Sequence, residues 1–225
     1  MYFLKKYILN FLSHLIHPLL GNRNQYNTQK HKVLYPINFI IWLILIPFKI
    51  LEIIGFSYLL NFIFKSFSKT RTLTNYEIQE LQLVFKNSID YSKVRINETS
   101  KWAKIGSKST KSKHLGFVWM QTINFTRVID CENNLNDIEW LVHEMVHISQ
   151  FKTLGIQYIF EALIAQHIGG YNYGGQSELQ NNKPLNYYNL EQQADILKHH
   201  YRALKHKNED TIFQKFSIDL MDKKF

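Results

Sequence analysis

The stretch that decides the fold is LVHEMVH, residues 141–147, in which His143 and His147 lie four residues apart. On a helix, residues at this spacing project from one face, so both imidazoles can reach a single metal ion. Glu144, directly after the first histidine, is then placed to take a proton from a water bound to that metal. The segment therefore predicts a buried helix that carries two zinc ligands and a general base.

The neighbouring residues support a helix here and restrict the kind of metal site. Asn136 is a suitable N-cap, Glu139 three residues later completes a capping box, and apolar residues recur at helical spacing after it. The chain has one cysteine, Cys131, which excludes a cysteine-rich zinc site and an internal disulfide. The alternative is a pair of core histidines bonded to backbone groups, which leaves several polar groups of the helix without partners.

A catalytic zinc site needs a third protein ligand and an open position for water. The best candidate is Glu191, because Asn189 and Gln192 form a second capping box that places it in the first turn of another helix. Asp195 lies four residues later on the same face, where it can accept the outer N–H of a ligand histidine and fix its tautomer. The rival third ligands are His167 and Glu161.

Three segments together, HEMVHISQ (143–150), YNYGG (171–175) and YYNLEQQADIL (187–197), carry a family resemblance. They resemble small HExxH proteins that occur with Rhs elements and Vgr spike proteins, and are similar to the metallopeptidase-like core domain of contractile injection systems. The similarity runs from about Leu73 to Leu204. It implies a gluzincin-type zincin fold, zinc on His143, His147 and Glu191, and a secretion-system or Rhs/Vgr partner.

Residues 69–225 are predicted to form an α+β, zincin-like domain with a small sheet packed on the two ligand helices. Residues 74–87 show helical periodicity, with Thr74 as a candidate N-cap and Glu77 three residues later, and residues 92–96 and 116–129 are typical of strands. In a zincin, the strand before the metal helix pairs with an extended peptide substrate, and residues 116–125 occupy that place. The candidate oxyanion stabilisers are Tyr187 and Tyr188, with Tyr171 and Tyr173 in the glycine-rich segment.

The first 68 residues form a hydrophobic region that is predicted to be helical. The longest run without charge, Tyr35–Phe48, is shorter than the roughly 20 residues of a membrane-spanning helix. A kinked span, a hairpin lying in the membrane plane and a helix pair buried against protein all remain open, and Lys49 and Glu52 favour the in-plane form. Residues 1–20 lack the cleavage site of a signal peptide, so the protein is expected to be cytoplasmic or membrane-associated.

The chain carries 27 lysines and arginines against 18 acidic residues, a net charge of +9, which favours anionic partners such as a membrane surface. No nucleic-acid-binding motif accompanies this charge, so nucleic acid is a weak candidate. The densest basic cluster lies among Ser, Thr and Gly, which predicts a solvated loop. It consists of Lys101, Lys104, Lys108, Lys111 and Lys113.

These patterns predict a zinc-dependent metallopeptidase that acts on a peptide or protein substrate. Zinc is the one cofactor expected, with Glu144 as the catalytic base. The competing hypothesis is a zinc-binding protein that keeps the zincin scaffold without turnover and associates with a membrane or with a secretion or injection system.

Overall fold

The computed structural model describes residues 55–66, 68–110, 115–166, 170–206 and 211–222, with isolated positions between residues 43 and 53. Contacts divide the chain into two units, Met1–Phe64 and Lys65–Phe225. The second unit combines several helices with a three-stranded sheet, which agrees with the predicted α+β class.

The helix α3 (Phe56–Ser66) stands at the end of the hydrophobic N-terminal region. Its Leu59 and Phe62 side chains are exposed. Within the described part of the chain, no helix combines the length and apolarity needed to cross a bilayer. Residues 36–42, several positions between 44 and 54, and all of residues 1–20 lie outside the described residues, so the three interpretations of this region stay predictions.

The sheet has three short strands, β1 (Arg95–Asn97), β2 (Gly116–Trp119) and β3 (Thr122–Phe125), in the order β1-β3-β2. The central strand β3 is parallel to β1, with Arg95 opposite Thr122, and antiparallel to β2, with Trp119 opposite Thr122. β2 is therefore an edge strand of this sheet.

Two of the predicted strands had the wrong extent. The segment 116–129 is not one strand, because Met120 adopts a left-handed backbone conformation (φ 54°) and the chain reverses between β2 and β3. The segment 92–96 begins later than predicted, since Tyr91–Lys93 form a 3-10 turn before β1. Both differences arise from tight local turns that the apolar pattern does not reveal.

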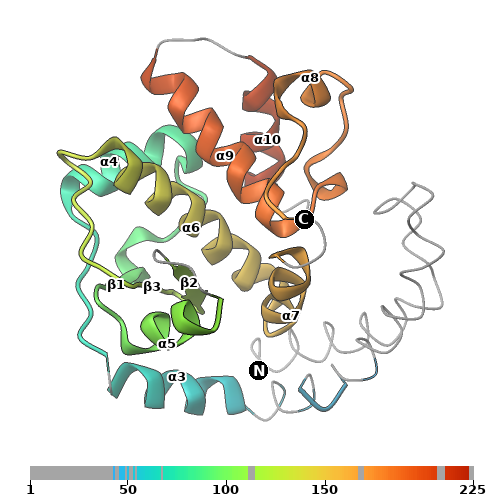
Figure 1. Cartoon of the computed structure of the whole chain (residues 1–225). Helices are drawn as coiled ribbons and strands as arrows, with labels where there is room; N and C mark the ends of the chain where they lie inside the picture. The colour runs from blue at the N-terminus through green and yellow to red at the C-terminus, as the bar shows by residue number, and fades with distance from the viewer. Residues whose placement is uncertain are drawn as a thin grey trace. The chain divides into compact units, whose positions relative to one another are not determined.

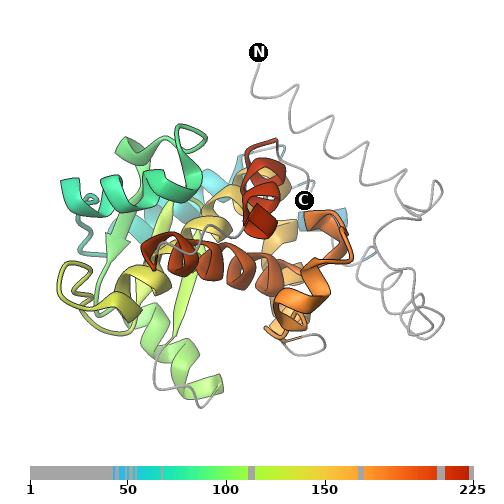
Figure 2. The same ribbon diagram turned by 90° about the horizontal axis from the view of Figure 1, so that it is seen from above.

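The longest described helix, α6 (Leu135–Leu154), packs against the sheet through β2 and β3 and against α9 (Leu190–Lys205), as Figures 1 and 2 show. A helix covered on more than one side is apolar around most of its circumference rather than along one stripe. Its buried residues accordingly include the apolar Met145 and the polar His143. The other helices are α4 (Asn75–Phe85), α5 (Lys101–Thr110), α7 (Gln157–Ile164), α8 (Gly175–Leu179) and α10 (Thr211–Met221).

The core forms where α4, α6, α9 and α10 meet. Phe85, Met145, Ile196 and Tyr201 are fully buried there, and Phe216 of α10 is almost so. α10 packs against both α9 and α4, and this packing stabilises the position of α9. This packing fixes α9 against α6, and the relative position of the two helices determines the geometry of the site.

Local capping signals were correct for two helices and wrong for the third. The capping boxes of Thr74 with Glu77 and of Asn189 with Gln192 are both present. α6 begins at Leu135 rather than after Asn136, because Asn134 is the N-cap and accepts the Asn136 N–H at 3.0 Å. Glu139, predicted to close a capping box, instead accepts a 2.6 Å hydrogen bond from Arg202 Nε of α9.

Candidate metal centre

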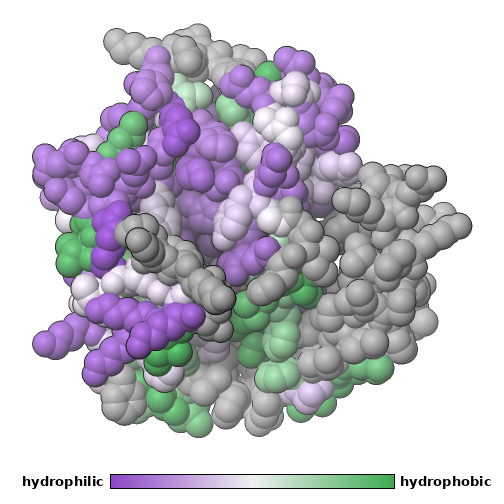
Figure 3. Space-filling model, in the orientation of Figure 1, coloured by the Kyte–Doolittle hydropathy of each residue, from purple (hydrophilic) through white to green (hydrophobic). Residues whose placement is uncertain are grey.

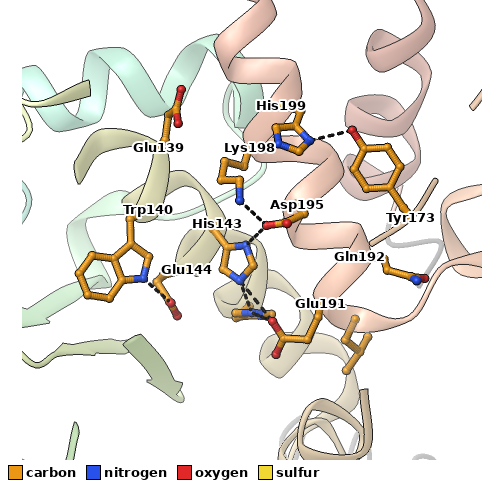
Figure 4. A network of polar contacts seen from close by, with 12 residues as sticks. Glu139, Trp140, His143, Glu144, Tyr173, Glu191, Gln192, Asp195, Lys198 and His199 are labelled. Atoms are coloured by element: carbon orange, nitrogen blue, oxygen red, sulfur yellow. Dashed lines mark hydrogen bonds and ion pairs between the residues drawn. The ribbon is translucent and has the colours of Figure 1, made fainter. Parts of the chain in front are cut away.

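Two histidines of α6 and one glutamate of α9 meet at the contact between these helices (Figure 4). One ligand atom from each of His143, His147 and Glu191 lies within 4.8 Å of the other two, and all three side chains are buried. The structure therefore brings together the three residues that the sequence predicts as zinc ligands, although 44 positions separate Glu191 from His147 in the chain.

The distances within this cluster fit a tetrahedral metal ion. The Nε2 atoms of His143 and His147 are 3.2 Å apart, and Glu191 Oε2 lies 3.3 Å and 3.6 Å from them. Ligands of tetrahedral zinc at bond lengths near 2.0–2.1 Å are separated from one another by roughly 3.3 Å. Glu191 Oε2 is buried and accepts no hydrogen bond from the part of the chain that the structure describes, so the oxygen that faces the two imidazoles is available to a cation.

Asp195 orients the first histidine. His143 Nδ1 lies 2.9 Å from Asp195 Oδ1, which also accepts a 2.6 Å hydrogen bond from Lys198 Nζ. Because a carboxylate can only accept, Nδ1 carries a proton and Nε2 faces the cluster. Burial lowers the pKa of His143, but the hydrogen bond with Asp195 and the nearby Glu191 carboxylate outweigh burial and raise this pKa to about 9.

The second histidine is oriented by a relay of amide side chains that the sequence reasoning missed. His147 Nδ1 lies 2.6 Å from Gln150 Oε1, while Gln150 Nε2 donates to Leu190 O at 3.1 Å and to Gln193 Oε1 at 2.8 Å. Gln193 Nε2 donates in turn to Tyr188 O at 2.8 Å. The two backbone carbonyls fix which way both amides face, so His147 Nδ1 must be the donor and its Nε2 faces the cluster.

This relay could have been foreseen only in part. Gln150 and Gln193 are both almost completely buried, and a buried amide needs several partners. Gln150 lies three residues after His147, on the same side of α6, and it belongs to the HEMVHISQ segment that carries the family resemblance. Nothing in the sequence tells that its partner is Gln193, which lies 43 residues further along the chain.

Glu144 lies beside the cluster and has one fixed and one free oxygen. Its Oε1 accepts a 3.1 Å hydrogen bond from Trp140 Nε1, whereas its buried Oε2 has no hydrogen-bond partner among the described residues. Burial raises the pKa of Glu144 against the opposing influence of both histidines. β2 approaches the same carboxylate so closely that a Cβ added at Gly116 would lie 2.2 Å from Oε1. A glycine is required here for the observed position of the Glu144 carboxylate.

Two tyrosines lie against the ligand rings. The Tyr171 ring centroid is 5.9 Å from that of His143, and the Tyr158 centroid is 5.5 Å from that of His147. Burial, helped by the charges of Glu191 and Glu144, raises the pKa of Tyr171, so its hydroxyl keeps its proton at neutral pH.

The two tyrosines that were the first candidates for an oxyanion stabiliser, Tyr187 and Tyr188, contact residues other than the ligand histidines. Tyr187 and Tyr188 pack on each other, Lys183 Nζ donates to the Tyr187 hydroxyl at 2.9 Å, and the Tyr188 ring packs on Phe216 of α10. The Tyr173 hydroxyl and His199 Nδ1 form a hydrogen bond of 2.7 Å. An oxyanion role for these three residues stays a prediction, and the ring contacts favour Tyr171.

Of the two rival third ligands, Glu161 is not part of the cluster found among the described residues. Glu161 of α7 accepts a 2.5 Å hydrogen bond from Gln157 Nε2, and His167 lies outside the described residues. On the other side of the cluster, Gln166 Nε2 donates to Glu191 Oε1 at 2.9 Å. This contact occupies one oxygen of Glu191 and directs the other, Oε2, towards the histidines.

Replacing Gln150 by leucine is expected to weaken zinc binding roughly 10- to 100-fold, because His147 loses the acceptor that fixes its tautomer. Competition for zinc with a fluorescent chelator measures this effect. Gln121→Leu, at an exposed position, is the control and should bind zinc like the unmodified chain. Equal affinity of both variants would show that the relay does not orient His147.

A scan of protein-family models and a search of the curated proteins found no match to this chain. Among solved structures, the effector domain of Pseudomonas aeruginosa VgrG2b is similar to it, with a TM-score of 0.48 and 26% sequence identity. The match covers 65% of this chain and 82% of that one.

Proposed function

We propose that this protein is a zinc-dependent metallopeptidase of the zincin type, which uses Glu144 as its general base. The observation that carries the proposal is the convergence of His143, His147 and Glu191 next to a buried glutamate with one unengaged oxygen. A structural zinc site is closed by four protein ligands, whereas a catalytic site has three and keeps a position open for water. The three ligands found among the described residues, with an adjacent base, match the second kind.

Zinc held by His143, His147 and Glu191 would supply a water of lowered pKa and a Lewis acid for the scissile carbonyl. Glu144 would accept the proton of that water on Oε2, while the Trp140 indole holds Oε1 in place. Its pKa, raised by burial, lets the carboxyl group hold this proton and then pass it to the leaving amine. The Tyr171 hydroxyl is the donor proposed for the developing oxyanion.

The substrate class follows from the position of β2. Because β2 is an edge strand of the sheet, an extended peptide can add to it by backbone hydrogen bonds. β2 begins at Gly116, directly beside Glu144. A peptide bound along this edge would pass the base, so a peptide or unfolded protein segment is the substrate that we propose.

The sequence resemblance supports a second candidate function, a zinc-binding scaffold of a secretion or injection system without turnover. Such a scaffold would use the same zinc ligands as the peptidase, His143, His147 and Glu191, but it would need no general base. The two candidates separate experimentally, because zinc content tests the site and peptide cleavage tests the chemistry. The unengaged oxygen of Glu144 favours the peptidase.

Replacing Glu144 by glutamine should leave zinc bound and reduce peptide hydrolysis by about 10²–10⁴-fold, because the amide cannot accept the proton. Zinc content by elemental analysis and cleavage of a diverse peptide library by mass spectrometry measure the two effects. Glu132→Gln, at an exposed position, is the control with full activity. Unchanged cleavage by the Glu144 variant would refute the assigned base, and zinc without any cleavage by the unmodified chain would favour the scaffold.

Gly116→Ala should reduce hydrolysis about 100-fold, because the added methyl group displaces the Glu144 carboxylate. The zinc ligands lie on other elements, so zinc content should stay that of the unmodified chain. Steady-state kinetics with a cleaved peptide, beside zinc analysis, test this separation. Full activity of the alanine variant would mean that the close approach of β2 does not position the base.

A further inference from the structure

The basic cluster that was predicted as a solvated loop lies largely on a helix, α5 (Lys101–Thr110). The helix is fixed at its start, where Ser100 Oγ accepts the Ala103 N–H at 3.3 Å and the Ser100 N–H donates to Phe125 O of β3 at 2.8 Å. The prediction of a loop was wrong because it used local composition alone, and the contact that anchors this helix on β3 is a tertiary one. Lys111 and Lys113 lie outside the described residues.

Small residues form the inner face of α5. Ala103 is fully buried, and a Cβ added at Gly106 would lie 2.8 Å from Leu115 Cδ2. The helix therefore packs too closely for large side chains on this face. Its large apolar residues face outwards instead, with Ile105 62% and Trp102 39% exposed. This reverses the usual arrangement, in which a surface helix buries its largest apolar side chains.

Lysines lie beside these apolar residues. Lys101, Lys104 and Lys108 are all exposed, and their spacing places them along one stripe of the helix. No aspartate or glutamate occurs between Thr99 and Ile129 in the sequence, so the charge of this segment has a single sign. In Figure 3, hydrophilic side chains extend from the surface over α5 with hydrophobic ones next to them.

We propose that α5 docks on the surface of an anionic lipid bilayer, with Trp102 and Ile105 entering the interface and the lysines contacting the headgroup phosphates. Helices that lie in the membrane interface combine lysine-rich flanks with exposed Trp, Phe or Leu in this way, and tryptophan is enriched at the headgroup level. A nucleic acid would contact the lysines but gains nothing from Ile105. The apolar composition of residues 36–64 gives the same chain a second segment suited to lipid.

The test is sedimentation of the full-length chain with vesicles of phosphatidylcholine alone, or of phosphatidylcholine mixed equally with phosphatidylglycerol. Replacing Lys101, Lys104 and Lys108 together by glutamine should lower partitioning into the anionic vesicles about 100-fold. Ile105→Ser should lower it about tenfold, because less apolar area enters the interface. Brominated lipids should quench the fluorescence of Trp102. The Trp102→Phe variant should therefore show less quenching than the unmodified chain.

Matched controls separate α5 from the rest of the chain. Val128, which is 60% exposed, is replaced by serine as the counterpart of Ile105. The exposed Lys69, Lys86 and Lys93 are replaced together by glutamine as the counterpart of the α5 lysines. Residues 1–64 are the same in every variant, so a difference between a variant and its control belongs to α5. Circular dichroism and zinc content check that each variant is folded.

The proposal is overturned if the α5 variants partition like their controls, which would assign lipid binding to other segments. It is also overturned if the lysine variant loses binding to single-stranded DNA while Ile105→Ser keeps full vesicle binding, because the surface then serves a nucleic acid. The result does not depend on peptide hydrolysis, so it stands or falls separately from the proposed enzyme.

Discussion

The structure depends on three buried groups that cannot satisfy one another while their metal-binding atoms carry no proton. The Nε2 atoms of His143 and His147 and the Oε2 atom of Glu191 lie 3.2–3.6 Å apart, and in their metal-binding protonation states all three are acceptors. Acceptors this close repel one another in an environment that excludes water. A divalent cation at their centre would turn that repulsion into attraction, and it would join α6 to α9 at the point where the two helices pack.

The outer sides of the two histidines are held by chemically different partners. Asp195 is a carboxylate shared with Lys198, whereas Gln150 is a neutral amide whose direction is set by backbone carbonyls near the start of α9. The first partnership runs directly from α6 to α9, and the second reaches α9 through the hydrogen bonds of Gln150 with Leu190 and Gln193. Ring orientation at the site therefore depends on correct docking of the two helices, and a change in that docking would disturb ligands and tautomers together.

The sequence revealed the parts of this site that follow from local rules. His143, Glu144 and His147 follow from helical spacing, and the capping box of Asn189 and Gln192 predicted the turn that carries Glu191. Features that depend on distant contacts were missed or misassigned. Glu139 was assigned to a cap but pairs with Arg202, which lies 63 residues further along the chain, and the relay from Gln150 to Gln193 exists only once α6 and α9 pack. The left-handed Met120, which divides a long apolar segment into a hairpin, has no signal in the pattern of apolar residues.

The central claim is that one zinc ion is bound jointly by α6 and α9, and metal analysis of the chain beside Glu191→Ala tests it most directly. We expect the purified chain to contain about one zinc per molecule, and the variant to lose it while keeping its helical circular dichroism spectrum. A variant that retains stoichiometric zinc would contradict the claim, since the carboxylate from α9 would then not be a ligand. A chain that binds no zinc even after reconstitution would contradict it entirely.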